Sequence, residues 1–419
     1  STNKSTATLS GTATIAVKTI EINGVAYPVT WTGVTTWSLS LPLAGRTNSL
    51  TFQGYDLRGK PIAGVSDTIT VTFTGTSQQP ENYLVINEIM YNPVTPETAF
   101  IEIHNTSTVS AFDLSNFRLE GVGFTFPEGV VLNANNYLVV AKNRTEFAKA
   151  YGLTVLPVGE FPGQLDNGGE TLRLVRPGAT PEEDTLIDEV RFDDDPPWPA
   201  LADGKGPSLQ LIDPFQDNYR AGNWTTVATN AVKLATPGGA NTPRASIPAF
   251  PPVWLNEVLP NNISGLTDHQ NDLDPWIELY NSGASQVSLN GHFLTASYTN
   301  LTQWPFPTNA VLQPGEFLVI WADGEPIESA TNEFHTNFRL LPSSGSVALT
   351  RLQNGLPAVM DHLNYTLISA GRSHGSFPDG QPRDRQVFHY STPGGTNSNV
   401  AIPISVFINE WMADNTRSY

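Results

Sequence analysis

A loop rich in acidic side chains contains the residues best suited to chemistry in this sequence. It reads TDHQNDLDPWIE, and its carboxylates are Asp268, Asp272, Asp274 and Glu278. Ca²⁺ takes about six to eight oxygen ligands, which such a loop can supply. The spacing is not that of an EF-hand, because the Gly and Glu of that motif cannot be set in register. Two interpretations stand, a calcium site and a solvated acidic loop.

A second acidic turn precedes two prolines and a tryptophan, and its carboxylates are Asp193, Asp194 and Asp195. Adjacent carboxylates repel one another unless a cation or water screens them. Calcium and plain solvent exposure again remain as the two interpretations. Beyond Ca²⁺ in these loops, the sequence gives no reason to expect a cofactor.

One pentapeptide, Gly371-Arg372-Ser373-His374-Gly375, has the form G-x-S-x-G of a serine nucleophile elbow. That elbow needs a strand, a sharp turn and a following helix. Residues 376–380 read SFPDG, which is a turn sequence and cannot begin a helix. We therefore expect no esterase, and no catalytic residue is assigned.

Four glutamates occupy matching positions in repeated strands, namely Glu88, Glu102, Glu257 and Glu278. A glycosidase would need two carboxyl groups that face each other across a cleft. Their repetition instead favours a structural role, in which they accept hydrogen bonds from backbone or Asn groups. Six of the seven His residues follow residue 260, and their spacing matches no metal motif. We expect these to be scattered strand and surface residues.

The composition predicts an all-β chain. Its 419 residues include 33 Pro and 34 Gly, as expected for short strands joined by turns. There is no Cys, which excludes disulfides, thiolate metal sites and a cysteine nucleophile. A net charge of −18 disfavours nucleic acid as a partner. No apolar run of ~18 residues is present, so we expect no membrane span.

Internal repeats define the organisation of the chain. LVINEIMYNP begins at Leu84, VWLNEVLPNN at Val253 and VFINEWMADN at Val406. In the first two copies a matching strand follows, FIEIHN or WIELYN, whose alternation predicts a half-buried strand. Both copies close with the sequence TPGG, from Thr236 and from Thr392.

We therefore predict tandem immunoglobulin-like β-sandwiches arranged as beads on a string. Their bounds are 1–78 for an N-terminal sandwich, 83–242 and 252–398 for two full repeats, and 404–419 for the first strand of a truncated third. In the N-terminal sandwich, Asn23-Gly24 predicts a type I′ hairpin. In the first repeat, residues 144–152 predict a short helix that ends at Gly152.

The motifs INEIMYNP, FIEIHN and VWLNEVLPNN resemble the lamin tail domain as it occurs in bacterial exported proteins. This resemblance implies a sandwich without catalysis of its own, in an accessory position within large surface proteins. The segment EINGVAYPVTW is similar to a β-domain that follows CotH-like kinase domains, although no kinase signature is present.

We therefore expect a non-enzymatic, extracellular array on the cell surface that serves as a spacer, scaffold or adhesion module. Its expected partners are another protein, a glycan, or a second copy joined through the C-terminal strand. One alternative is a calcium-dependent carbohydrate-binding module, in which exposed tryptophans would stack on sugars. Another is an accessory region of a larger enzyme, such as a CotH-like kinase or a hydrolase.

Overall fold

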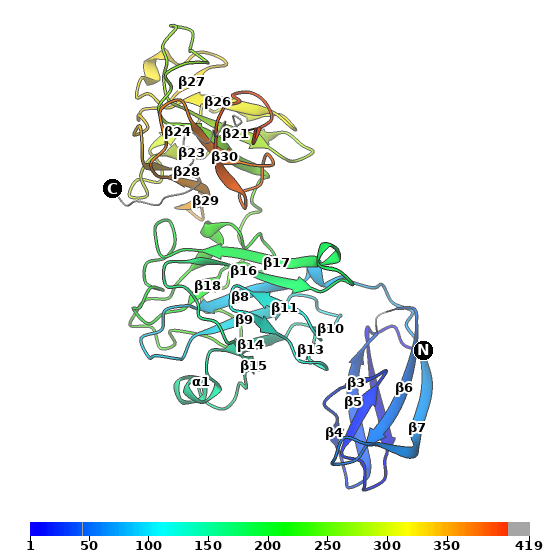
Figure 1. Ribbon diagram of the computed structural model, residues 1–419. Coiled ribbons are helices and arrows are strands. Elements are labelled where there is room, and N and C mark those ends of the chain that lie inside the picture. Colours follow the sequence, from blue (N-terminus) through cyan, green and yellow to red (C-terminus); the bar gives the residue numbers. More distant parts are fainter. Residues whose placement is uncertain (44, 401–419) are drawn as a thin grey trace, which may run out of the picture. The chain divides into compact units, whose positions relative to one another are not determined.

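The computed structural model describes residues 1–43 and 45–400, and the predicted strand at 404–419 lies outside them. The chain divides into two compact units, the first spanning Ser1–Phe250 and the second beginning at Pro251. The regular structure of both units consists mostly of short antiparallel strands, with one parallel strand pair in each unit (Figure 1). The all-β prediction is therefore confirmed.

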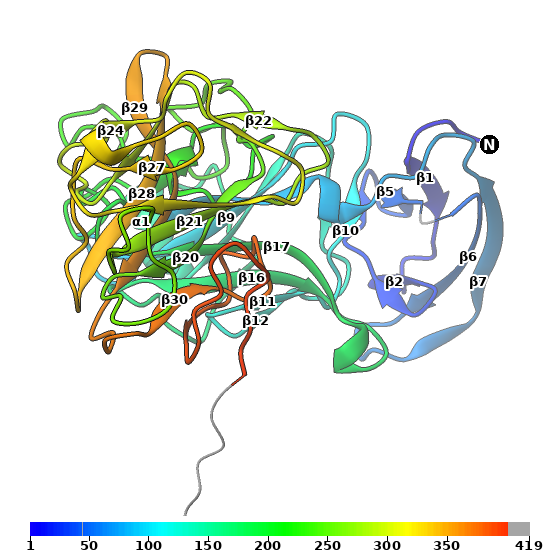
Figure 2. The same cartoon turned by 90° about the horizontal axis from the view of Figure 1, so that it is seen from above.

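Residues 1–72 form two sheets. The three-stranded sheet runs β1 (Thr6–Thr12), β5 (Thr36–Pro42), β4 (Thr30–Trp31), and the four-stranded sheet runs β3 (Val25–Ala26), β2 (Thr19–Ile22), β6 (Thr47–Tyr55), β7 (Pro61–Thr72). Figure 2 shows the long pair β6 and β7 side by side. Inward residues of both sheets, among them Ile22, Trp37 and Phe52, make one buried core. Asn23 and Gly24 have φ of 53° and 84°, so the predicted hairpin is confirmed.

The first repeat packs a six-stranded sheet against a four-stranded one. The six strands are β15 (Gly159–Glu160), β14 (Tyr137–Ala141), β9 (Phe100–Asn105), β8 (Leu84–Met90), β18 (Leu209–Leu211) and β19 (Trp224–Thr225). The four are β12 (Phe124–Thr125), β11 (Arg118–Glu120), β16 (Glu170–Arg176) and β17 (Thr185–Phe192). β10 (Phe112–Asp113) pairs with β13 (Val131–Leu132). Both large sheets contribute to a single apolar core.

The second repeat has the same strand order. Its six-stranded sheet runs β27 (Phe334–His335), β26 (Phe317–Trp321), β21 (Trp276–Asn281), β20 (Val253–Leu259), β30 (Ser373–Ser376), β31 (Arg385–Phe388). Its four-stranded sheet runs β24 (Trp304–Pro305), β23 (His292–Thr295), β28 (Gly345–Gln353), β29 (Leu356–Tyr365). β22 (Val287–Ser288) pairs with β25 (Val311–Leu312). The two copies therefore match strand by strand.

The strands predicted to be half-buried are buried on both faces. All six residues of β9 are buried, and so are five of the six in β21. The alternation of apolar and polar residues does not separate buried side chains from exposed ones here. It separates side chains that are buried in two different places. Apolar side chains such as Ile101 enter the core, whereas polar ones such as Glu102 lie under the closing segment of the repeat.

The repeats differ in the segment that joins β14 to β15 in the first repeat and β26 to β27 in the second. In the first repeat it contains the predicted helix α1 (Arg144–Tyr151), which Asn143 caps and after which Gly152 has φ of 88°. In the second it contains only the short 3₁₀ helix η4 (Pro326–Glu328). Other 3₁₀ turns are η1 (Pro80–Asn82), η2 (Pro181–Glu183) and η3 (Ala221–Asn223). Within residues 1–43 and 45–400, no helix combines the length and hydropathy that crossing a bilayer requires.

Candidate functional site

A pair of buried glutamates faces the closing segment in each repeat. Glu88 of β8 lies opposite Glu102 of β9, and Glu257 of β20 lies opposite Glu278 of β21. All four side chains are 0% exposed. In both copies the register shifts by one residue just before the first glutamate, so Asn87 and Asn256 are the extra residues of a β-bulge. A bulge re-aims the neighbouring side chains and strengthens the local twist.

In the first repeat the two carboxylates hold the Thr-Pro-Gly-Gly turn. Glu88 accepts hydrogen bonds from the hydroxyl of Ser208 (2.5 Å) and from the backbone N–H of Thr236 (2.8 Å). Glu102 accepts from the side-chain amide of Asn87 (2.8 Å) and from the N–H of Gly238 (2.5 Å). We call this arrangement of two glutamates and one TPGG turn the carboxylate clasp.

The second repeat builds the same clasp from its own residues. Glu257 accepts from the hydroxyl of Ser373 (2.5 Å) and from the N–H of Thr392 (3.1 Å). Glu278 accepts from Asn256 Nδ2 (3.0 Å) and from the N–H of Gly394 (2.6 Å). These contacts agree with the sequence expectation that the glutamates bind backbone and Asn donors. The sequence did not indicate that their target is the TPGG turn.

Burial raises the pKa of each clasp carboxyl. The pKa of Glu88 and that of Glu257 rise to about 7, although the Ser and Thr donors oppose the shift. Burial raises the pKa of Glu278 to about 8, with the charge of Glu257 adding to it. Burial and the neighbouring charge of Glu88 lift the pKa of Glu102 well above its ordinary range. Carboxyl groups with shifted pKa values are typical of active sites, but here the carboxylates accept hydrogen bonds from groups of the same repeat.

Ser373, the serine of the G-x-S-x-G pentapeptide, lies within strand β30 and is 0% exposed. Its hydroxyl donates to Glu257, as that of Ser208 does to Glu88 in the first repeat. A strand followed by a turn is not a nucleophile elbow, and the turn agrees with the one expected from residues 376–380. Ser373 is therefore part of the clasp.

The acidic loop of the second repeat brings three of its four predicted ligands together. One carboxylate oxygen from each of Asp268, Asp272 and Asp274 lies within 4.8 Å of the others. Glu278 is elsewhere, because its oxygens accept from Asn256 and Gly394. Asp274 also forms an ion pair with Arg339 (2.7 Å), which supplies a positive charge to the loop. Calcium binding here stays a prediction.

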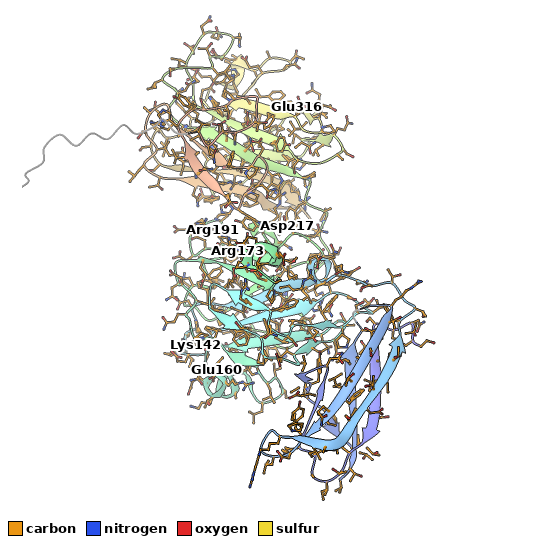
Figure 3. All side chains as sticks on the ribbon, turned by 45° about the vertical axis from the view of Figure 1, so that its right-hand side comes forward. Lys142, Glu160, Arg173, Arg191, Asp217 and Glu316 are labelled. Atoms are coloured by element: carbon orange, nitrogen blue, oxygen red, sulfur yellow. The ribbon has the colours of Figure 1, made fainter. Side chains whose placement is uncertain are left out.

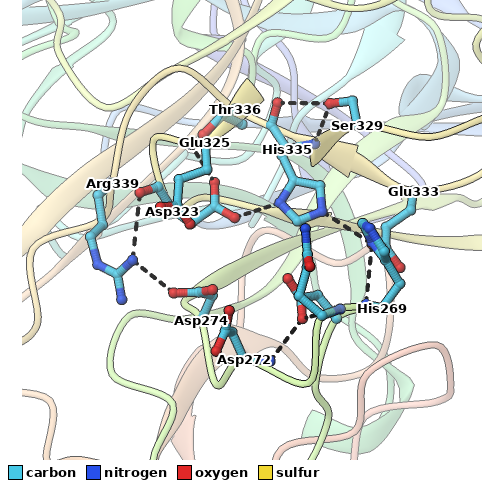
Figure 4. A network of polar contacts seen from close by, with 12 residues as sticks. His269, Asp272, Asp274, Asp323, Glu325, Ser329, Glu333, His335, Thr336 and Arg339 are labelled. Atoms are coloured by element: carbon cyan, nitrogen blue, oxygen red, sulfur yellow. Dashed lines mark hydrogen bonds and ion pairs between the residues drawn. The ribbon is translucent and has the colours of Figure 1, made fainter. Parts of the chain in front are cut away.

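A polar network that the sequence did not reveal adjoins this loop (Figure 4). The ring of His335 is 0% exposed, and its Nδ1 lies 2.5 Å from Asp323 Oδ2. Its Nε2 lies 3.1 Å from Glu333 Oε1, the oxygen that also pairs with His269 Nδ1. The one local sign in the sequence is Glu333-x-His335, because residues two apart in a strand share a face.

The carboxylates of this network influence the titration of both histidines. Burial lowers the pKa of His335, but the bonds to Glu333 and Asp323 outweigh it, so the pKa is raised. The bond to Glu333 raises the pKa of His269 as well. The network therefore favours positive charge at its centre.

The acidic turn of the first repeat also gathers its residues. Asp193, Asp194 and Asp195 place one oxygen each within 4.8 Å of the others. Asp193 Oδ1 accepts from the N–H of Asp195 (3.0 Å), and partial burial raises the pKa of Asp193. All three are at least partly exposed, as in an ordinary Asx turn, so a cation at this turn stays a prediction.

Fold and clasp together define a tandem array of immunoglobulin-like β-sandwiches. The family model for the Lamin Tail Domain matches residues 77–194 and 247–366, which together make up more than half of the chain. The chain belongs to the lamin tail domain family, in two copies, and this family consists of immunoglobulin-like domains that are not enzymes in themselves. The comparisons do not support a CotH-associated domain before them.

Two further comparisons do not help to assign a function. No curated protein matches the chain significantly. Among solved structures, InvD of Yersinia pseudotuberculosis is 10% identical over 88% of this chain and 89% of its own, with a TM-score of 0.13. A likeness this low carries no argument about the fold.

Proposed function

We propose that the chain is a non-catalytic, extracellular array of sandwich modules that acts as a spacer or scaffold in a larger surface protein. The observation that carries this proposal is the clasp. The glutamates that would be candidates for hydrolysis are buried and hydrogen-bonded to the TPGG turn in both copies, and the candidate serine, Ser373, is buried and donates to Glu257. A catalytic pair must instead reach a substrate. Support for an extracellular location comes from the likeness to bacterial exported lamin tail domains.

Absence of turnover is the first test. The intact chain and its Ser373→Ala variant are assayed against panels of esters and glycosides. We expect no turnover above the buffer rate for either protein. Turnover that Ser373→Ala abolishes while the fold is retained would contradict the proposal.

Location is tested on the source cells. An antibody against the chain should label intact, unpermeabilised cells, and external protease should remove that label. Label that appears only after permeabilisation would place the array inside the cell. The array could also be joined to a kinase or hydrolase domain in the same protein, which is compatible with the proposal. The coding sequence on either side of this chain shows whether such a domain is present.

A calcium-dependent adhesion module is the second candidate function. Its support is the grouping of Asp268, Asp272 and Asp274. Stacking on sugars has less support, because four tryptophans are at most 6% exposed, namely Trp198, Trp224, Trp304 and Trp321. Binding of Ca²⁺ that Asp272→Ala removes, together with retention on a glycan surface only with Ca²⁺, would favour this candidate.

Self-association through residues 404–419 remains a proposal as well. A single strand can pair with an open sheet edge of another copy. Light scattering should then show an oligomer that grows with concentration and is lost when the residues after Ala401 are deleted. A monomer at every concentration would contradict it.

A further inference from the structure

The ring of His335 is fixed on three sides in the second repeat. Its Nδ1 pairs with the buried carboxylate of Asp323, whose other oxygen accepts from the N–H of Glu325 (2.9 Å). Its face lies against Trp321 at 6.3 Å between ring centroids. On the third side, Nε2 lies 3.1 Å from Glu333 Oε1. A carboxylate behind a histidine is how proteins orient and strengthen a metal ligand.

His335 belongs to two separate groups of residues that could hold a metal ion, and Asp268 shares a group with His335 but not with His269 or Glu333. Oxygen or nitrogen atoms of His269, Glu333 and His335 lie within 4.8 Å of one another, and so do those of Asp268, Glu328 and His335. Asp268 is 5% exposed, and its Oδ2 has no hydrogen-bond donor among the described residues. A buried carboxylate oxygen without a partner is costly. A cation at this point would satisfy it.

The donor set favours a transition metal over calcium. Two imidazoles and two carboxylates suit Zn²⁺, whereas Ca²⁺ selects oxygen ligands alone. Tetrahedral zinc with bonds of about 2.0 Å places its ligand atoms about 3.3 Å apart. Glu333 Oε1 and His335 Nε2 are already 3.1 Å apart. Asp274 is less suited as a ligand, because Arg339 pairs with it.

In the first repeat, the corresponding segment is held in place without an ion. The position that matches His335 in the parallel pairing is Glu160, which lies with Lys142 beside α1 (Figure 3). Glu160 accepts from the N–H of Arg144, and Phe147 of α1 is buried against Phe100. Apolar packing therefore fastens this segment in the first repeat. The second repeat has no α-helix in residues 322–333, only the short 3₁₀ helix η4, and polar side chains occupy that place.

We propose that the second repeat binds one zinc ion through His269, Glu333, His335 and Asp268, with Asp323 orienting His335, and that this ion fastens residues 323–339 to the loop at 265–274. The site goes beyond the proposed function and does not depend on it. Four protein ligands would close the coordination sphere, as in structural zinc sites.

The test is calorimetric titration of Zn²⁺ into the chelator-treated full chain. We expect one ion per chain, binding lost in His335→Ala, and binding weakened about 10–100-fold in Asp323→Asn. Because His335→Ala removes a buried ring, His269→Gln provides a second ligand variant whose side chain is 49% exposed in the native protein. His389→Ala, in the same repeat and outside the network, is the matched control and should bind zinc as the native chain does.

Cobalt gives an independent readout of the ligands. Co²⁺ added to the native chain should give the visible absorption bands of a tetrahedral nitrogen and oxygen site, and His269→Gln should lose them. Three results would overturn the proposal: no zinc binding by the native chain, binding that His269→Gln leaves unchanged, or calcium binding that zinc does not displace.

Discussion

Asn87 and Asn241, which are 154 residues apart, bond each other in both directions. Asn87 Nδ2 donates to Asn241 Oδ1 (3.1 Å), and Asn241 Nδ2 donates to the backbone carbonyl of Asn87 (2.8 Å). This link ties the bulge in the first strand of the repeat to the residues just after its TPGG turn. It therefore joins the two ends of the module, next to the clasp.

Asn241→Ala should destabilise the first repeat markedly. It leaves the carbonyls of Asn87 and Leu211 without their donor, and each unpaired buried group costs about 1–3 kcal/mol. Urea unfolding measures the change. Asn300→Ala removes an exposed side chain and serves as the control. Equal stabilities of the two variants would show that the link contributes nothing.

Alanine at the clasp glycines should have unequal effects in the two repeats. Gly238 and Gly394 have φ of 80° and 76°, which costs an L-residue about 1–2 kcal/mol at either site. A Cβ at Gly238 would also lie 2.3 Å from Val155 Cγ2, whereas nothing lies within 4 Å of one at Gly394. Thermal unfolding should therefore show the larger loss for Gly238→Ala. A larger loss for Gly394→Ala would contradict the geometry.

Stability of the second repeat should fall as pH rises from about 6.5, above which the buried His292 and His374 are mostly neutral in both states, to about 8.5. Burial raises the folded-state pKa of Glu257 to about 7 and of Glu278 to about 8. At these two glutamates the folded state therefore holds more protons than the unfolded state, and their contribution to stability is lost as pH rises through the folded-state pKa values. Glu278→Gln removes one titrating group and should flatten the slope. An unchanged slope in urea unfolding at several pH values would refute this.

The sequence predicted the repeats, the hairpin at Asn23-Gly24 and the helix that follows Asn143 because each depends on local chemistry. Turn residues with positive φ, a capping side chain and a terminal Gly determine these features within a few residues. The Asn-Glu and TPGG motifs marked the two ends of each repeat. That they touch one another is a tertiary fact, since more than a hundred residues separate Glu102 from Gly238 in sequence.

The histidine network could not be predicted from the sequence for the same reason. His269 and Glu333 are 64 residues apart, and the parallel pairing of β26 with β27 brings them to one place. The expectation of scattered histidines was therefore wrong for His269 and His335. Alternation in β9 also failed to predict burial, because a segment from the far end of the repeat covers the polar face.

Hydrogen exchange at the clasp amides is the most direct test of the claim that the buried glutamates are structural. The amides of Gly238 and Gly394 should be as protected as those of the core strands, since each donates to a buried carboxylate. Glu102→Gln should accelerate exchange at Gly238 and leave Gly394 unchanged, which makes the second repeat an internal control. Rapid exchange at both amides in the native chain would show that the carboxylates do not hold the turns, and the account of the clasp would fail.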